Sequence, residues 1–238
     1  GHIVNDAAFK KFVIIGGGND STGFSTSKTA AGTLNSRYAV LCHGGFEQPY
    51  VLNPAILTKK SSIYMAALVS GRLSGLEPQV PLTYKNLNIT KLRHVMTETE
   101  RVEAIDKGVL HVRTVPQLGF VVNQAVNTLQ QNSFMINNDG SSPEVSIERI
   151  EAQLNREIAE SAVSFIGSNL TSVGEADLII FMKNYLEAKR NQGLIISGGN
   201  IKAKRTGTVW HITYDFQPNS PINKILSTGT IVDPTLAA

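Results

Sequence analysis

The sequence predicts an α/β unit followed by an α+β unit, with the first at residues 3–125, the second at 126–238 and the boundary near 115–140. Strand-like and helix-like segments alternate up to about residue 122, two helical segments follow, and the remainder is strand-like. The chain has 238 residues, of which 42% are hydrophobic and 17% charged. This composition argues against disorder, and the length suffices for a sizeable core.

Two β-branched runs that end near glycine open the first unit. Residues 9–18 (FKKFVIIGGG) and Arg37–Cys42 (RYAVLC) are predicted to be buried strands. Asn19–Leu34 is rich in Gly, Ser and Thr, which predicts a long surface loop, and Glu47–Pro54 is predicted to be a second loop. Lys60–Leu76 is predicted to be a helix whose small residues allow close approach to a sheet.

The segment between Gly108 and Gly167 is predicted to organise the rest of the chain. Val109–Val115 and Phe120–Val122 read as two strands. After a turn-rich loop, apolar residues at three- and four-residue steps from Ile147 to Phe165 predict a long amphipathic helix. This pattern indicates packing of a strand pair against a helix.

The remaining elements follow from capping signals and alternation. Thr97–Lys107 has a threonine cap, acids in its first turn and Gly108 beyond, which predicts a short helix. Glu175–Arg190 has acids at its start, bases at its end and Gly193 beyond, which predicts another helix. The predicted short strands are Leu87–Ile89, Leu194–Ile196, Thr208–Phe216, Ile222–Leu226 and Gly229–Val232.

Charge, cysteine content and hydropathy exclude several classes of function. The net charge is +3, and the densest basic segments, Lys85–His94 and Lys202–Arg205, read as solvated faces, so we expect no nucleic-acid partner. The single cysteine, Cys42, excludes an intrachain disulfide and reads as a buried hydrophobe. No apolar run of about 18 residues exists, so no membrane insertion is expected. The start at Gly1-His2, without methionine, predicts a truncated or protease-resistant fragment.

The triple glycine Gly16–Gly18 follows a predicted strand and invites a phosphate-binding interpretation. It matches neither a dinucleotide-binding GxGxxG nor a Walker loop, because no GK[ST] follows. The next segment lacks helical periodicity, so the electrostatic contribution of a helix N-terminus would be missing. We therefore expect a turn that needs positive φ, with no cofactor. The alternative is an α/β nucleotide-binding protein or enzyme that uses this turn.

An Asp-His-Ser order imitates a subtilisin-type hydrolase. Asp20 and His43 would supply the acid and the base, and Ser70 or Ser74 the nucleophile. Both serines lie inside a helical pattern without a strand-turn elbow or an oxyanion loop, so no catalytic residue is predicted.

The histidines and the tryptophan give no metal or stacking site. His43, His94, His111 and His211 show neither i,i+4 pairing nor carboxylates at ligand spacing, so no metal is expected. His111 and His211 alternate with apolar neighbours and read as sheet-face residues. Trp210 reads as a core or interface residue.

The order of these segments resembles the tail sheath proteins of contractile-tailed bacteriophages. The resemblance covers nearly the whole chain, and the order of the motifs carries it because each is weak alone. The matching stretches are KFVIIGGG with NSRYAVLCHGG, then SIYMAALVSGRLSGLEPQVPLTYKNL, then ETERVEAIDKGVLHVRTV with GFVVNQAVNTLQ, and finally SIERIEAQLNREIAESAVSFIGSNL with ADLIIFMKNYLEAKRNQGLI.

The resemblance implies a structural protein without catalysis, whose first unit is a partial subtilisin-like domain and whose second is a sheath assembly domain. It implies hexameric rings of copies around a tail tube, contraction that drives the tube through the host envelope, and contacts with baseplate and tail terminator proteins. It places the protein in the virion tail, after assembly in the host cytoplasm. The family's N-terminal arm is expected to be missing here.

The resemblance also suggests which residues make contacts. Terminal arms in this family add strands to neighbouring subunits, so the strand candidates for self-assembly are Ile222, Ile225, Leu226, Ile231 and Val232. The candidates for contact with the tube are Lys183, Lys189 and Arg190, with a solvated helix end as the alternative. The sheath of a related bacterial contractile injection system is a further alternative.

Overall fold

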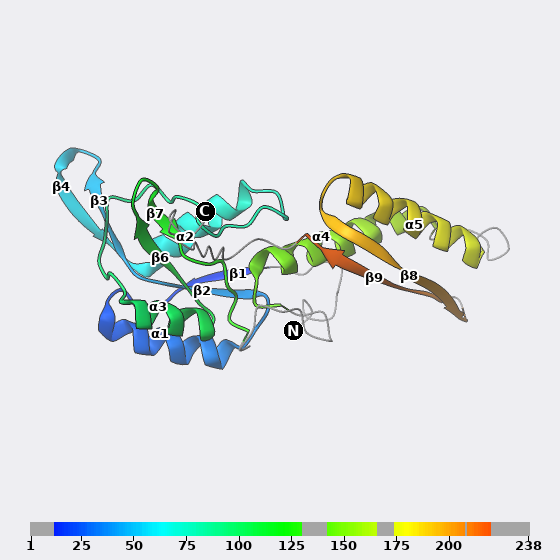
Figure 1. Ribbon diagram of the computed structural model, residues 1–238, viewed down its shortest axis with the longest axis horizontal. Helices are drawn as coiled ribbons and strands as arrows, with labels where there is room; N and C mark the ends of the chain where they lie inside the picture. Colours follow the sequence, from blue (N-terminus) through cyan, green and yellow to red (C-terminus); the bar gives the residue numbers. More distant parts are fainter. Residues whose placement is uncertain (1–11, 130–141, 166–173, 208, 220–238) are drawn as a thin grey trace, which may run out of the picture.

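The computed structural model describes residues 12–129, 142–165, 174–207 and 209–219. Figure 1 shows an elongated molecule with two ends. A sheet covered by helices occupies one end, and a long two-stranded ribbon with its own helix occupies the other. Helix α4 (Val145–Ala162) lies between them.

A four-stranded sheet in the order β1-β2-β6-β7 forms the first end. Its strands are β1 (Val13–Gly16), β2 (Ala39–His43), β6 (Val109–Val115) and β7 (Gly119–Val122). β1, β2 and β6 run parallel, with His43 beside His111, whereas β7 pairs antiparallel with β6. Gly16 and His43 therefore both lie at one edge of the sheet, where the parallel strands end; we call it the carboxyl edge.

Helices cover both faces of this sheet. They are α1 (Ser21–Leu34), α2 (Ser62–Ser74) and α3 (Glu98–Asp106). Leu41 packs with Phe24 of α1 and Ala104 of α3, while its neighbour Cys42 packs with Met65 of α2. Because consecutive strand residues point to opposite faces, β2 is buried on both sides, with α1 and α3 on one side and α2 on the other (Figure 1).

A small antiparallel sheet projects from this end, in the order β4-β3-β5. Its strands are β3 (Phe46–Tyr50), β4 (Asn53–Lys60) and β5 (Lys91–Leu92). The expected loop at Glu47–Pro54 was wrong, because Pro49 and Pro54 signal a loop but sit in a hairpin that tolerates them. At its tip, Val51 and Leu52 are 90% and 83% exposed.

The second end is built from α4, a 3-10 turn, α5, β8 and β9. The bounds are Val163–Phe165 for the turn, Glu175–Asn191 for α5, Ile195–Thr206 for β8 and Val209–Pro218 for β9. Val145, at the start of α4, belongs to the core under the first sheet, whereas Ile150 and Leu154 pack with Leu186 of α5. Helix α4 therefore contributes to two cores. The predicted boundary near 115–140 stays a prediction.

The sequence-based prediction differs most from the structure at α1. The loop expected at Asn19–Leu34 is a 14-residue helix that Asp20 caps, with Phe24, Ser27 and Ala31 buried at helical spacing. Only one of those three is a large apolar residue, so the periodic signal was too weak to recognise. The strand expected at Leu87–Ile89 was also wrong, since the short strand there is β5.

The other predicted elements within the described residues are confirmed, with shifted ends. Thr97 and Glu100 form a full capping box on α3, and Gly108 beyond it has φ +67°. Gly193 beyond α5 has φ +74°. β8 extends well beyond the strand expected at Leu194–Ile196. Its continuation SGGNIKAKRT was not predicted as a strand because it carries little apolar alternation. Among the described residues, no helix is both long and apolar enough to cross a membrane.

Candidate functional site

Three places could carry function: the carboxyl edge, the contacts of α4, and the β8–β9 ribbon. At the carboxyl edge, the glycines are required for close packing. A Cβ on Gly16 would lie 2.5 Å from the Ile63 nitrogen, and one on Gly18 would lie 2.3 Å from the Gly23 oxygen. None of the three consecutive glycines has positive φ, so the turn expected to need positive φ was wrong. Close approach of backbones explains these residues instead.

The helix that follows the glycines removes the electrostatic objection to phosphate binding, but a carboxylate already occupies its N-terminus. Asp20 Oδ1 accepts hydrogen bonds from the Gly23 nitrogen at 3.0 Å and the Thr22 hydroxyl at 2.7 Å. These bonds lower the pKa of Asp20, so it is negatively charged at neutral pH. The Gly18 N–H, a donor that could meet phosphate, binds Ser27 Oγ at 2.8 Å. A phosphate would meet an anion there.

The hydrolase-like residues are not assembled into a triad. Ser70 and Ser74 lie on α2, where the Ser74 hydroxyl donates to the Ser70 carbonyl at 2.9 Å. The serine that meets His43 is Ser27, with 3.0 Å between Oγ and Nδ1. Ser27 is 1% exposed, so it cannot reach a substrate in this conformation.

Two histidines that are 51 residues apart in sequence meet at the same edge. His43 Nε2 lies 3.1 Å from His94 Nδ1, and burial lowers the pKa of His43 to about 4. The sequence spacing of these histidines does not reveal this pair, because the tertiary fold brings them together. His211 is exposed on β9, opposite Lys204. In the described part of the chain, no cluster of three His, Cys, Asp or Glu side chains could hold a metal ion.

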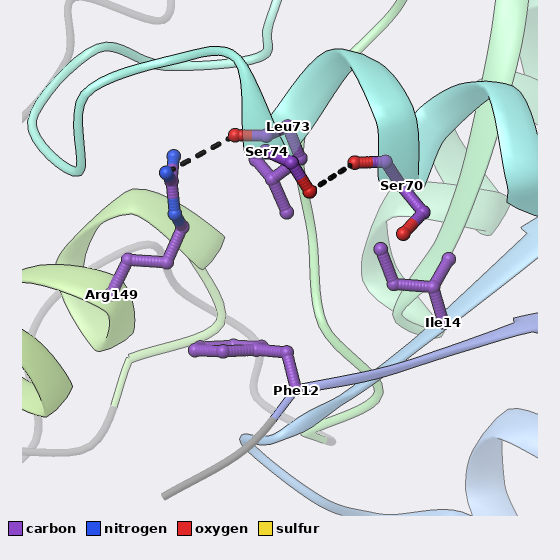
Figure 2. A pocket seen from close by; sticks show the side chains of 6 residues that line it. All are labelled: Phe12, Ile14, Ser70, Leu73, Ser74 and Arg149. Carbon is purple, nitrogen blue, oxygen red and sulfur yellow. Dashed lines mark hydrogen bonds between the residues drawn. The ribbon is translucent and has the colours of Figure 1, made fainter.

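A cavity of about 300 Å³ lies beside α2, lined by Phe12, Ile14, Ser70, Leu73, Ser74 and Arg149 (Figure 2). The Arg149 guanidinium of α4 donates to the backbone oxygens of Leu73 at 3.2 Å, Leu76 at 2.6 Å and Glu77 at 3.4 Å. Burial lowers the pKa of Arg149. The Leu73 carbonyl belongs to the last turn of α2 and the other two follow the helix, so these bonds place a cation at its negative end. Arg149 therefore acts as a cap that attaches α4 to α2.

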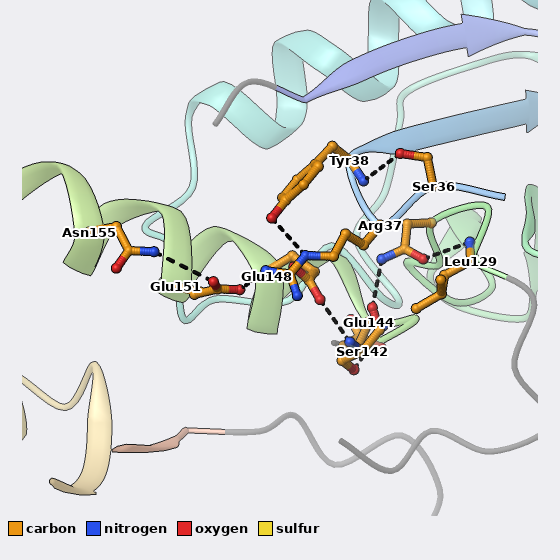
Figure 3. A network of polar contacts seen from close by, with 10 residues as sticks. Ser36, Arg37, Tyr38, Leu129, Ser142, Glu144, Glu148, Glu151 and Asn155 are labelled. Carbon is orange, nitrogen blue, oxygen red and sulfur yellow. Dashed lines mark hydrogen bonds and ion pairs between the residues drawn. The ribbon is translucent and has the colours of Figure 1, made fainter. Parts of the chain in front are cut away.

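A second contact attaches α4 to the sheet (Figure 3). Arg37, just before β2, lies with Nε 2.9 Å from the Glu148 carboxylate, and its terminal nitrogen pairs with Glu151. Glu148 is fully buried and also accepts the Ser142 N–H at 2.7 Å. Burial disfavours the charge on Arg37, but the two carboxylates outweigh it and raise its pKa.

This polar contact continues along α4 to the ribbon. Glu151 accepts a bond from the Asn155 amide, and the Tyr214 hydroxyl of β9 donates to Asn155 Oδ1 at 2.9 Å. Burial and the nearby Glu151 raise the pKa of Tyr214 to about 12. We call Arg37, Glu148, Glu151, Asn155 and Tyr214 the α4 joint. It ties the first sheet to the ribbon through one helix.

Within the described residues, the ribbon has two strand edges without a partner strand. β8 and β9 pair only with each other among the described residues, over a register from Ile195–Pro218 to Thr206–Val209. One face packs on α4 and α5 through Ile201, Tyr214 and Phe216, and the other faces outward. Unpaired strand edges are sites for strand addition.

The residues predicted for tube contact belong to α5 at this end. Ile222, Ile225, Leu226, Ile231 and Val232 fall outside the described residues. Lys183 is exposed on α5, and Arg190 lies 3.3 Å from Glu187. Lys189 points toward α4, with Nζ 2.6 Å from the Glu157 carboxylate. Sequence reasoning missed Arg37, Arg149 and Tyr214, which no motif distinguishes from other residues of their type.

Solved structures with this fold come from contractile systems. The chain matches the anti-feeding prophage baseplate with a TM-score of 0.64 at 15% identity, over 84% of this chain and 56% of that one. It matches the contracted sheath complex of the extracellular contractile injection system PVC with a TM-score of 0.64 at 14% identity, over 93% and 64%. The sheath tail protein of Desulfitobacterium hafniense gives 0.59 at 13%, over 79% and 47%. The mixed α/β fold is that of contractile sheath proteins.

The sequence relatives are tail sheath proteins of phages. A protein of Enterococcus phage phiEF24C named as a tail sheath protein is 25% identical over 218 residues, covering 90% of this chain and 37% of the relative. The tail sheath protein of Bacillus phage SP01 is 23% identical over 230 residues, covering 95% and 39%. No family model matches the chain. The expected resemblance to phage tail sheath proteins is confirmed, and the chain spans about two fifths of the length of these relatives.

Proposed function

We propose that this chain is part of a structural subunit of a phage contractile tail sheath. Copies would polymerise around the tail tube as hexameric rings, and contraction would drive the tube through the host envelope. The observation that carries this proposal is the β8–β9 ribbon, whose edges have no partner strand in the described part of the chain and which lies at the far end of the molecule from the first sheet. Similarity to phage sheath proteins supports the same function.

Strand addition at the ribbon is the proposed means of assembly. A strand containing Ile222, Ile225, Leu226, Ile231 and Val232 from one copy would pair with a ribbon edge of the next copy. Backbone hydrogen bonds would then join the copies, and they can persist while the subunits move as rigid bodies. The α4 joint supports this mechanism because it would transmit force from the ribbon to the first sheet.

The remaining partners follow from the same proposal. Lys183, Lys189 and Arg190 are proposed to face the tail tube, and the assembled sheath would end at a baseplate and a tail terminator in the virion, after assembly in the host cytoplasm. The parallel order β1-β2-β6 with helices on both faces supports a subtilisin-like first domain. We infer a protein that is not an enzyme, because Ser27 is buried and Asp20 blocks the glycine turn.

A sheath of a bacterial contractile injection system is the second candidate. The fold matches such assemblies, but both sequence relatives come from phages, which favours the phage sheath.

Isotope-mixed cross-linking tests the assembly mode. Equal amounts of ¹⁴N- and ¹⁵N-labelled chain are mixed at high concentration, treated with a lysine cross-linker and analysed by mass spectrometry. Strand addition predicts mixed-isotope links between Lys224, inside the proposed strand, and Lys202 or Lys204 on β8. Lys59, on the β3–β4 hairpin at the opposite end, is the control and should not link to Lys224.

Negative-stain microscopy of the same samples would reveal rings, tubes or linear oligomers if the proposal holds. Monodisperse single chains whose Lys224 links are all within one isotope would overturn it. Thermal stabilisation by a nucleotide would instead support the alternative at Gly16–Gly18.

A further inference from the structure

Four side chains form a continuous polar chain from the core to the surface at the carboxyl edge. Ser27 Oγ lies 3.0 Å from His43 Nδ1, His43 Nε2 lies 3.1 Å from His94 Nδ1, and His94 Nε2 lies 3.7 Å from the Glu100 carboxylate. Ser27 and His43 are buried, whereas His94 and Glu100 are partly exposed. These four side chains connect α1, β2 and the start of α3, three elements that are distant in sequence.

One set of donor directions agrees with every contact when both histidines are neutral. The Gly18 N–H donates to Ser27 Oγ, and the Ser27 hydroxyl donates to His43 Nδ1. His43 then carries its proton on Nε2 and donates to His94 Nδ1, and His94 directs its Nε2–H at the Glu100 carboxylate. The opposite tautomers would leave a bare His94 nitrogen facing a carboxylate, which is unfavourable.

A proton on His94 requires the opposite direction in the two hydrogen bonds of His43. Protonated His94 has a hydrogen on both ring nitrogens, so Nδ1 must donate to His43 Nε2. His43 must then hold its single ring proton on Nδ1 and donate it to Ser27 Oγ. The structure supplies the last acceptor, because the Gly23 carbonyl lies 3.1 Å from Ser27 Oγ. One proton is taken from water, His43 exchanges one ring N–H for the other, and the Ser27 hydroxyl keeps its proton and rotates.

We propose that Ser27, His43, His94 and Glu100 form a proton-operated relay, in which protonation of His94 at the surface reverses both hydrogen bonds of His43 and moves the Ser27 hydroxyl from His43 to the Gly23 carbonyl in the first turn of α1. The two acceptors within reach of Ser27 make both states hydrogen-bonded. The relay couples surface pH to the packing of α1 on the sheet.

The groups around His43 and His94 determine which of the two histidines binds the proton. Burial and the neighbouring His94 lower the pKa of His43 to about 4, so His43 stays neutral at neutral pH. The Glu100 carboxylate, whose pKa is lowered by its bonds to Thr97, stays negative beside His94. The charged or titratable groups around the relay are Asp20 before α1, Arg93 and Glu100 beside His94, Arg101 on α3, and His111 and Arg113 on β6.

Nitrogen-15 NMR of the histidine rings in the intact chain tests the relay. At neutral pH, His43 should show the Nε2–H tautomer. As His94 titrates, His43 should change to the Nδ1–H tautomer without becoming charged. A His43 that keeps one tautomer while His94 changes charge, or that itself becomes charged with His94, would overturn the proposal.

Ser27→Ala removes the acceptor that the protonated state needs, and Ser25→Ala, at an exposed position of α1, is the matched control. A buried donor without an acceptor is costly, so proton binding at His94 should weaken about tenfold in Ser27→Ala, which moves its titration about one pH unit lower. Ser25→Ala should leave it unchanged. If Ser27→Ala does not fold, Ser27→Cys should shift the titration in the same direction, because a thiol is a weak acceptor. An unchanged titration in the folded variant would contradict the relay.

Discussion

The two ends of the molecule are stabilised in different ways. The first sheet is built from parallel strands that are distant in sequence, such as β2 and β6, and helices bury it on both faces. The ribbon is a hairpin of consecutive strands, with one face on α4 and α5 and the other exposed. The first arrangement buries the central strand β2 on both faces, whereas the second leaves both strand edges without a partner strand among the described residues. The difference separates a core built by distant segments of the chain from one built by neighbouring segments.

Helix α4 is the element that the two ends share. Its first turn lies in the core under the first sheet, its middle lies in the core under the ribbon, and Arg37 and Arg149 attach it to β2 and α2. The following variants test whether the two ends unfold together or separately.

Arg37→Met should have the largest effect. It leaves the Glu148 carboxylate buried without its cation, and removing one partner of a buried pair costs about 3–5 kcal/mol. Because Arg37 joins the ends, urea unfolding should lose stability and the two ends should separate into two transitions. Arg156→Met, at an exposed position of α4, is the control and should change stability by less than about 0.5 kcal/mol.

The double variant Arg37→Met with Glu148→Met checks the cause of this loss. It removes both charges from the site and should recover most of the stability. A double variant as unstable as Arg37→Met alone would show that the buried charge is not responsible.

Leu154→Ala should come next and should act on the ribbon end. Leu154 is fully buried against α5 and β8, and truncation of such a leucine costs about 2–5 kcal/mol. Hydrogen exchange should accelerate in β8 and β9 more than in β1, β2 and β6. Equal acceleration at both ends would show that the molecule unfolds as one unit, which would contradict separate stabilisation of the two ends.

The sequence predicts elements that depend on neighbouring residues better than contacts between distant segments. Local signals predicted α3 with its Thr97 cap, α5 with Gly193, and the central strands, because capping and periodicity involve neighbours in sequence. The contacts of Arg37 with Glu148 and of His43 with His94 could not be predicted, because tertiary packing brings them together. Helix α1 was not predicted because Ser27 and Ala31, which lie on its buried face, are not large apolar residues.

Acid should weaken the first end through His43. Its pKa is about 4 in the folded chain and 6.5 without burial, so the unfolded chain binds the proton more readily between these values. Stability from this residue is fully present above about pH 6.5, falls as pH decreases through this interval, and is lost by about pH 4. The loss amounts to about 2–3 kcal/mol. Thermal melts from pH 7 to 4 should show a smaller acid loss in His43→Gln than in the parent chain, whereas His211→Gln on the ribbon should match the parent.

Gly32→Ala should have the smallest effect, and it should be stabilising. Gly32 lies inside α1, is exposed, and a Cβ there would meet nothing within 4 Å, so alanine should add about 0.5–1 kcal/mol through helix propensity. Gly18→Ala is the contrasting variant, because its Cβ would collide with Gly23, and it should destabilise. If the ends unfold separately, Gly32→Ala raises only the transition of the first sheet and leaves hydrogen exchange in β8 and β9 unchanged. Slower exchange in the ribbon would instead show that α4 carries stability from one end to the other.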